Sequence, residues 1–135
     1  MFDKLDSLKP HAHWLLRFGL AGVFIFHGMG KVMNIGGFAE MMGLPTSVAG
    51  LVTVAELAGG VGIIVGAFTN DLITRLAGLA VAPVMLGAIF MVHWGRCNFM
   101  PGEGFPAGGM EFQVVLLCSA LYFLVMGNAG LNRAS

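Results

Sequence analysis

Charged side chains are scarce in this sequence: lysine, arginine, aspartate and glutamate together make up 10% of the 135 residues. A soluble domain usually carries about 25% charged residues, because polar groups must cover much of its surface. Apolar residues reach 57%. This value also excludes a disordered chain, since disorder requires low hydrophobicity and high net charge. The composition therefore indicates a protein whose solvent is lipid.

The sequence also lacks an excess of either charge sign and has almost no cysteine. Seven basic residues balance seven acidic ones, so the electrostatic footprint of a nucleic-acid-binding protein is absent. Cys97 and Cys118 are the only cysteines, too few for a disulfide framework. No haem or flavin motif is present in the sequence. We therefore do not expect an electron-transfer enzyme that works alone.

Four long apolar runs are present, each close to the length of about 20 residues that a helix needs to cross a membrane. They predict an all-α membrane protein, with residues 1–135 forming a single domain, a four-transmembrane-helix bundle. A cleaved signal peptide is an alternative for the first run, but Arg17 interrupts it and no small-residue cleavage site follows. The continuous runs also differ from the alternating strands of an outer-membrane barrel. The predicted helices cover residues 13–33, 48–68, 72–94 and 112–131, and Pro83 is expected to kink the third.

The basic residues favour one orientation of this bundle. With four helices, both termini lie on one side of the membrane, and the longer connections, residues 34–47 and 95–110, lie on the other. The positive-inside rule places the more basic side in the cytoplasm. We therefore predict a protein of the inner cell membrane with both termini cytoplasmic. The terminal side holds Lys4, Lys9, Arg75 and Arg133, and the opposite side holds Lys31 and Arg96.

Glycine is abundant, with 21 residues, and much of it lies inside the predicted helices. Small residues let helix backbones approach closely in lipid. Gly62 and Gly66 form one small-xxx-small pair. This pair predicts either tight packing inside the bundle or a seam between two copies of the chain.

Five ionisable residues fall in the outer half of the predicted bundle, where an ionisable group usually faces the bundle interior or a cavity. Helical geometry places His27 and Lys31 on one stripe, one turn apart, and Glu56 near the middle of the second helix. We predict that the Lys31 ammonium meets the Glu56 carboxylate in a polar pocket that opens outward beside His93 and Glu111. In this scheme Glu56, His27 and Lys31 are the catalytic candidates, and His93 and Glu111 bind ligand.

Arg17 stands apart from these residues, toward the cytoplasmic end of the first helix. One interpretation is a side chain that extends to the membrane surface, as long cationic side chains near helix ends commonly do. The other is a residue that contributes to ligand binding.

The outer loop after the third helix contains possible soft metal ligands. His93, Cys97 and Met100 lie close together in the sequence and would suit Cu(I). Their spacing matches no established site, however, and methionine is a common filler of apolar gaps. We therefore predict no metal site, and copper or small-solute transport is kept only as an alternative function.

Five short segments follow one another in a fixed order: Leu15-Leu16-Arg17, Phe26-His27-Gly28-x-x-Lys31, Glu56-Leu57-x-Gly59-Gly60, His93, and Gly108-Gly109-x-Glu111. Their order and spacing resemble those of the DoxX family of small four-helix membrane proteins, and the resemblance extends from Leu15 to Ser135. One difference is the tail, where this chain lacks the Gly-Pro-Gly turn that the family tends to have.

This resemblance implies a link to the membrane subunits of thiosulfate:quinone oxidoreductase. It suggests a quinone-interacting subunit of a redox assembly, with quinone as the cofactor. Its partners would be the lipid bilayer and other membrane subunits, or a second copy of the chain. Histidine can hydrogen-bond a quinone carbonyl and exchange protons near neutral pH, and a buried glutamate can deliver protons. The alternative is a non-catalytic scaffold subunit, in which the polar cluster only holds the helices together.

Overall fold

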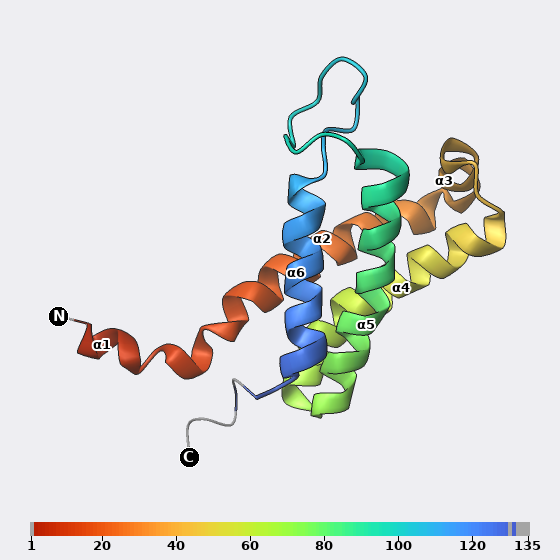
Figure 1. Ribbon diagram of the computed structural model, residues 1–135. Coiled ribbons are helices and arrows are strands. Elements are labelled where there is room, and N and C mark those ends of the chain that lie inside the picture. Colours follow the sequence, from red (N-terminus) through yellow and green to blue (C-terminus); the bar gives the residue numbers. More distant parts are fainter. Residues whose placement is uncertain (1, 130, 132–135) are drawn as a thin grey trace.

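The computed structural model describes residues 2–129 and residue 131, and helices dominate this part of the chain (Figure 1). Four long helices are joined by one short helix and two connections, and a short helical segment precedes the first of them. The elements are α1 (Asp3–Asp6), η1 (Lys9–His11), α2 (His13–Met33), α3 (Ile35–Met42), α4 (Thr46–Phe68), α5 (Asp71–Ala88), the π-helical turn η2 (Ile89–His93) and α6 (Glu111–Met126). The predicted all-α membrane bundle is confirmed.

Three of the helices are long and apolar enough to cross a membrane: α2, α4, and α5 continued by η2. Their bounds lie within two residues of those predicted. Pro83 lies inside α5, which continues through it without a break. The fourth helix is shorter than predicted, because α6 ends at Met126 and Gly127 turns the chain with a positive φ of 52°.

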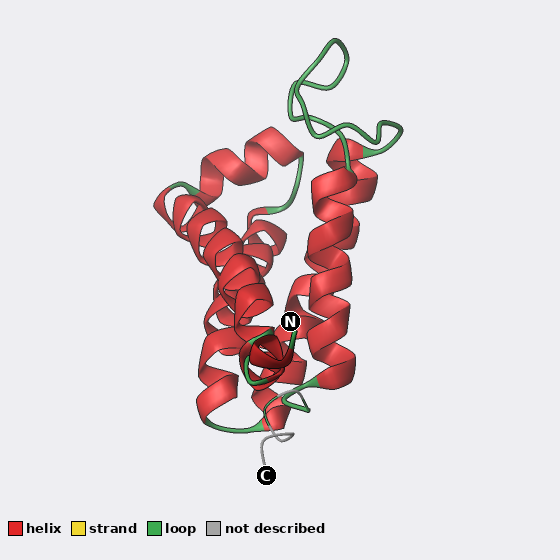
Figure 2. Ribbon diagram, turned by 90° about the vertical axis from the view of Figure 1, so that its left-hand side faces the viewer, coloured by secondary structure: helices red, strands yellow, loops and turns green. Residues whose placement is uncertain are grey.

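The helices pack in a chain of neighbours, α2 on α4, α4 on α5, and α5 on α6, with little contact between α2 and α6. Figure 2 shows the consequence: α5 and α6 form an upright pair that carries the long loop, and the remaining helices lie beside it. The shared core is apolar, with Phe24, Ile63, Val81 and Phe123 almost completely buried. Large apolar side chains such as Leu15 are exposed on the outside of the bundle, as expected of a surface that faces lipid.

The two ends of the bundle differ. α3 and the loop of residues 94–110 lie at one end, and α1 and the turn between α4 and α5 lie at the other (Figure 1). This arrangement agrees with the predicted sidedness of the loops. Which end faces the cytoplasm stays a prediction, and Arg133, one of the residues behind it, lies outside the described part of the chain. In accordance with that prediction, the end with α3 and the 94–110 loop is called the outer end and the opposite end the inner end.

Gly62 and Gly66 lie against α5. A Cβ built on Gly62 would lie 2.9 Å from the Ala77 Cβ, and one on Gly66 would lie 2.6 Å from the backbone nitrogen of Thr74. The glycines therefore allow close α4–α5 packing within one chain. The alternative, in which this pair forms a seam between two copies of the chain, is wrong.

Replacing Gly66 with alanine should lower the free energy of unfolding by about 1–3 kcal/mol, because the α5 backbone must move away from the new methyl group. Gly22→Ala is the matched control, since a Cβ at Gly22 would meet no atom within 4 Å. Thermal unfolding in detergent, followed by circular dichroism, measures both variants. An unchanged midpoint for Gly66→Ala would contradict the close contact.

Candidate functional site

An ion pair joins α2 to α4 in the outer half of the bundle. The Lys31 Nζ lies 2.7 Å from the Glu56 Oε2, and the two side chains are 16% and 5% exposed. The same Nζ lies 4.9 Å from the centroid of the Phe38 ring on α3. The contact predicted between Lys31 and Glu56 is thus confirmed, and α3 provides an aromatic face that the prediction did not include.

A cavity of about 180 Å³ lies beside this ion pair, between α2, α3 and α4 on one side and α5 with η2 on the other. Lys31 and Glu56 are the charged residues in its wall, and every other residue that lines it is apolar. Those residues are Phe38, Met42, Leu44, Val52, Pro83, Val84, Met85, Gly87, Ala88, Met91 and Val92.

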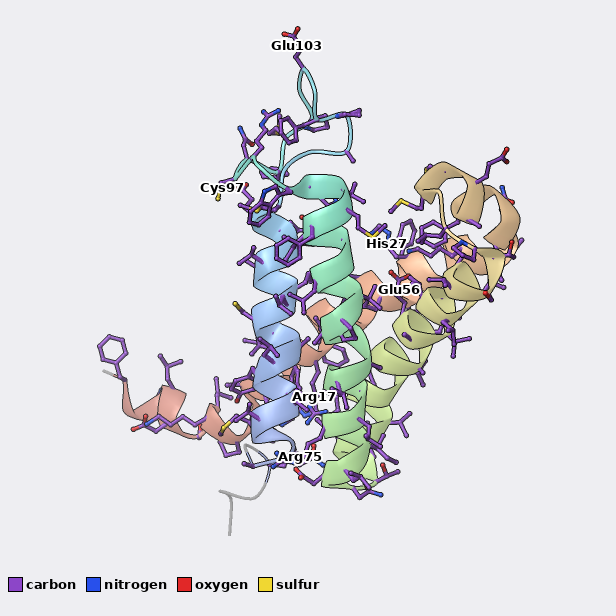
Figure 3. All side chains as sticks on the ribbon, turned by 45° about the vertical axis from the view of Figure 1, so that its right-hand side comes forward. Arg17, His27, Glu56, Arg75, Cys97 and Glu103 are labelled. Carbon is purple, nitrogen blue, oxygen red and sulfur yellow. The ribbon has the colours of Figure 1, made fainter. Side chains whose placement is uncertain are left out.

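His27 lies outside this cavity. It lines an open groove of about 680 Å³ between α2 and α3, on the other side of Lys31 and Phe38, which border both spaces. The His27 ring is exposed and lies edge-on to that of Phe26, with the ring centroids 5.7 Å apart. Figure 3 shows His27 on the outer side of Glu56. His27 and Lys31 therefore lie on one stripe of α2, as predicted. His27 lines the groove, however, and Lys31 lies between the groove and the cavity.

His93 and Glu111 do not border the cavity, so the predicted common pocket is wrong in this part. His93 is buried and turned toward α6 and the 94–110 loop. Its Nδ1–H donates to the Gly108 carbonyl oxygen at 2.9 Å, and its Nε2 accepts from the Gln113 amide at 3.0 Å. Glu111 borders a shallow surface depression beside Phe99. Both residues lie at the helix ends predicted for them, but the direction of each side chain depends on which helices are neighbours.

Two of the possible metal ligands of the outer loop, His93 and Cys97, lie in different surroundings. Both ring nitrogens of His93 are engaged in hydrogen bonds within the chain, and Cys97 is exposed. Among the residues that the structure describes, no group of three or more His, Cys, Asp or Glu side chains could hold a metal ion.

Arg17 is completely buried near the inner end of the bundle (Figure 3). Its Nε donates to the His13 Nδ1 at 3.0 Å, and its Nη1 donates to the Ile63 carbonyl oxygen and to the Thr74 Oγ1, the latter at 3.3 Å. Its Nη2 donates to the Asn128 Oδ1 at 2.7 Å. The interpretation of Arg17 as a side chain that extends to the membrane surface is therefore wrong. Its contribution to ligand binding stays a prediction.

Asn128 connects this buried arginine to the rest of the inner end. Its side-chain amide donates to the Gly66 carbonyl oxygen at 2.8 Å, and its backbone N–H donates to the Asp71 Oδ1 at 2.5 Å. Arg75 pairs with Asp71 and also donates to the carbonyl oxygens at the end of α6. Sequence reasoning missed Asn128 as a structural residue. The available signal was a polar side chain at the end of an apolar run.

Comparison with known proteins agrees with this architecture. Residues 12–94, which contain Arg17, the Lys31–Glu56 pair and His93, match the DoxX family. Over 117 residues the chain is 31% identical to the protein named "Putative oxidoreductase CatD" of Bacillus subtilis (strain 168), covering 84% of this chain and 78% of that protein. No solved structure matches. Three helices suited to crossing the bilayer, the buried polar residues and this match together identify the chain as an integral membrane protein that belongs to the DoxX family.

Proposed function

We propose that this chain is the quinone-interacting subunit of a membrane redox assembly. The observation that carries the proposal is the Lys31–Glu56 ion pair in the wall of an otherwise apolar cavity. At about 180 Å³ the cavity is smaller than the roughly 300–1,000 Å³ of sites for drug-sized ligands. Its size suits a single ring, and its walls suit a lipid-soluble molecule. The similarity to a protein named as an oxidoreductase supports the redox assignment.

The ion pair has the chemistry that quinone reduction needs. A quinone that accepts two electrons also takes up two protons, one at each carbonyl oxygen. The Lys31 ammonium can donate a hydrogen bond to one carbonyl oxygen. The Glu56 carboxylate can take up a proton and pass it to a carbonyl oxygen within hydrogen-bond reach, and a second proton taken up in the same way would go to the other carbonyl oxygen. Protons would reach the pair from the open groove on the other side of Lys31, where His27 lies. The electrons would come from a partner subunit.

Binding of a ubiquinone with a decyl tail to the purified protein in lipid nanodiscs tests the proposal. We expect Glu56→Gln to weaken binding about tenfold, which corresponds to about 1.4 kcal/mol, because it removes the charge that orients the Lys31 ammonium. Glu103→Gln, at an exposed position in the 94–110 loop, is the matched control and should bind like the wild type. A wild-type protein that binds no quinone, or a Glu56→Gln variant that binds equally well, would count against the proposal.

The second candidate is a non-catalytic scaffold subunit. It is supported by Arg17, a buried cation that joins α2 to α4, α5 and the segment after α6. A scaffold requires the Arg17 network for assembly and tolerates Glu56→Gln without loss of function. Glu56→Gln and Arg17→Leu, each assayed in the native membrane, therefore separate the two candidates.

A further inference from the structure

We infer that the cavity takes its ligand from the lipid phase, through a lateral opening alongside α5 and η2 that is bordered by Pro83, Gly87 and Met91. This inference rests on the proposed function and adds two elements to it, the route of entry and a residue that sets the width of the opening.

The outer end of the cavity is covered. α3 folds across the outer ends of α2 and α4 (Figure 1), and its Phe38 and Met42 line the cavity together with Leu44. Phe38 contacts the Lys31 ammonium, and these two side chains separate the cavity from the open groove. A ligand dissolved in water outside the membrane therefore meets an apolar cover.

The side of the cavity formed by α5 and η2 is open to the outside of the bundle. Pro83 and Met91 line the cavity and are also exposed on the surface of the bundle. The cavity is therefore not closed off from the outside of the bundle at these two residues. The α5–η2 span ends at His93. At 1.5 Å per residue, Met91 lies about 3 Å, Gly87 about 9 Å and Pro83 about 15 Å below that end. In a hydrocarbon core about 30 Å thick, this opening faces the acyl chains of the outer half of the bilayer.

Gly87 lies at the centre of this opening. A Cβ built on it would meet no atom within 4 Å, although the residue lines the cavity. Gly87 differs in this respect from Gly59, Gly66 and Gly78, where an added Cβ would collide with a neighbouring helix. The missing side chain at Gly87 therefore serves no helix contact, and it leaves open the space through which a flat ring could pass. A larger side chain here would narrow the opening without disturbing the helix packing.

The first test compares Gly87→Leu with Gly22→Leu, a matched change at an exposed glycine of α2 that lies away from the cavity and where an added Cβ would likewise meet no atom within 4 Å. Both variants should unfold at the wild-type temperature. We expect the decyl-tailed ubiquinone to associate with Gly87→Leu at least tenfold more slowly than with the wild type in nanodiscs, and with Gly22→Leu at a rate within twofold of the wild type. An unchanged association rate for Gly87→Leu would overturn the inference.

The second test is independent of quinone binding. With Cys97 and Cys118 replaced by serine, a nitroxide spin label is attached to Gly87→Cys in lipid bilayers. Its collisions with oxygen, which concentrates in the hydrocarbon, should be frequent, and those with a water-soluble nickel chelate should be rare. Glu103→Cys, in the exposed loop, should give the opposite result. Frequent collisions of the label at position 87 with nickel would overturn the lateral opening. A lipid-facing label in a protein that binds no quinone would instead leave the opening supported and reject the proposed function.

Discussion

Replacing Arg17 with leucine should lower the free energy of unfolding by about 4 kcal/mol. The variant removes the charged donor from the His13 ring nitrogen, the Ile63 carbonyl oxygen and the Asn128 amide oxygen, which then keeps the Thr74 hydroxyl as its donor. Hydrogen bonds to charged groups contribute roughly 1.5–3 kcal/mol each, and a buried polar group left unpaired costs about 1–3 kcal/mol. Unfolding of the purified protein by a graded increase in denaturing detergent, followed by circular dichroism, measures the change.

Two further variants make this prediction specific. Arg17→Lys should recover little of the loss, because a single ammonium cannot reproduce the planar set of donors that meets four different acceptors. Arg96→Leu removes the same kind of side chain from the outer loop, where it lies over the Phe105 ring, and should unfold nearly like the wild type. The structural role of Arg17 would be contradicted if Arg17→Leu were as stable as Arg96→Leu.

Replacing Glu56 with alanine should cost about 3 kcal/mol of stability, because it leaves the Lys31 ammonium without its partner between α2, α3 and α4. Breaking a buried ion pair from one side usually costs about 3–5 kcal/mol. The lower end is expected here, since the Lys31 side chain is 16% exposed. The same detergent titration measures this variant.

The pairing itself is tested by a double-mutant cycle. Lys31→Met combined with Glu56→Ala should cost less than the two single changes added together, because the double variant leaves no unpaired charge. Glu103→Ala combined with Lys31→Met supplies the control pair, and its effects should simply add. Additive effects for Lys31 and Glu56 would show that the ion pair does not exist in solution.

The membrane helices could be predicted from the sequence because lipid imposes a narrow range of lengths and excludes charge. The Lys31–Glu56 contact followed from the same constraint: a charge at mid-membrane needs a partner, and helical periodicity left few candidates at the right depth. α3 was expected only as part of an outer loop. Its local signals were nevertheless present, with Asn34 accepting from the Gly37 N–H at the first turn and Gly43 ending the helix with a positive φ of 61°.

The remaining errors share one physical cause. Periodicity and depth locate a side chain on its own helix, but they do not say which helix lies opposite. His93 lies at the end of its helix, as predicted, yet it is turned toward α6 and the loop because α5 packs between α4 and α6. Arg17 and Asn128 meet although 111 residues separate them, and no local pattern encodes a contact of that range.

This separation also determines when the inner end of the protein can be completed during synthesis. Arg17 leaves the ribosome 111 residues before Asn128, an interval of roughly 6–22 s at 5–20 residues per second. Until then the guanidinium has only the acceptors that α2, α4 and α5 provide. Asn128 therefore completes, late in synthesis, the environment of a charge that is inserted with the first long helix. A nascent chain that stops before Asn128 would hold an incompletely satisfied cation in the bilayer, which would make it a target for membrane proteases.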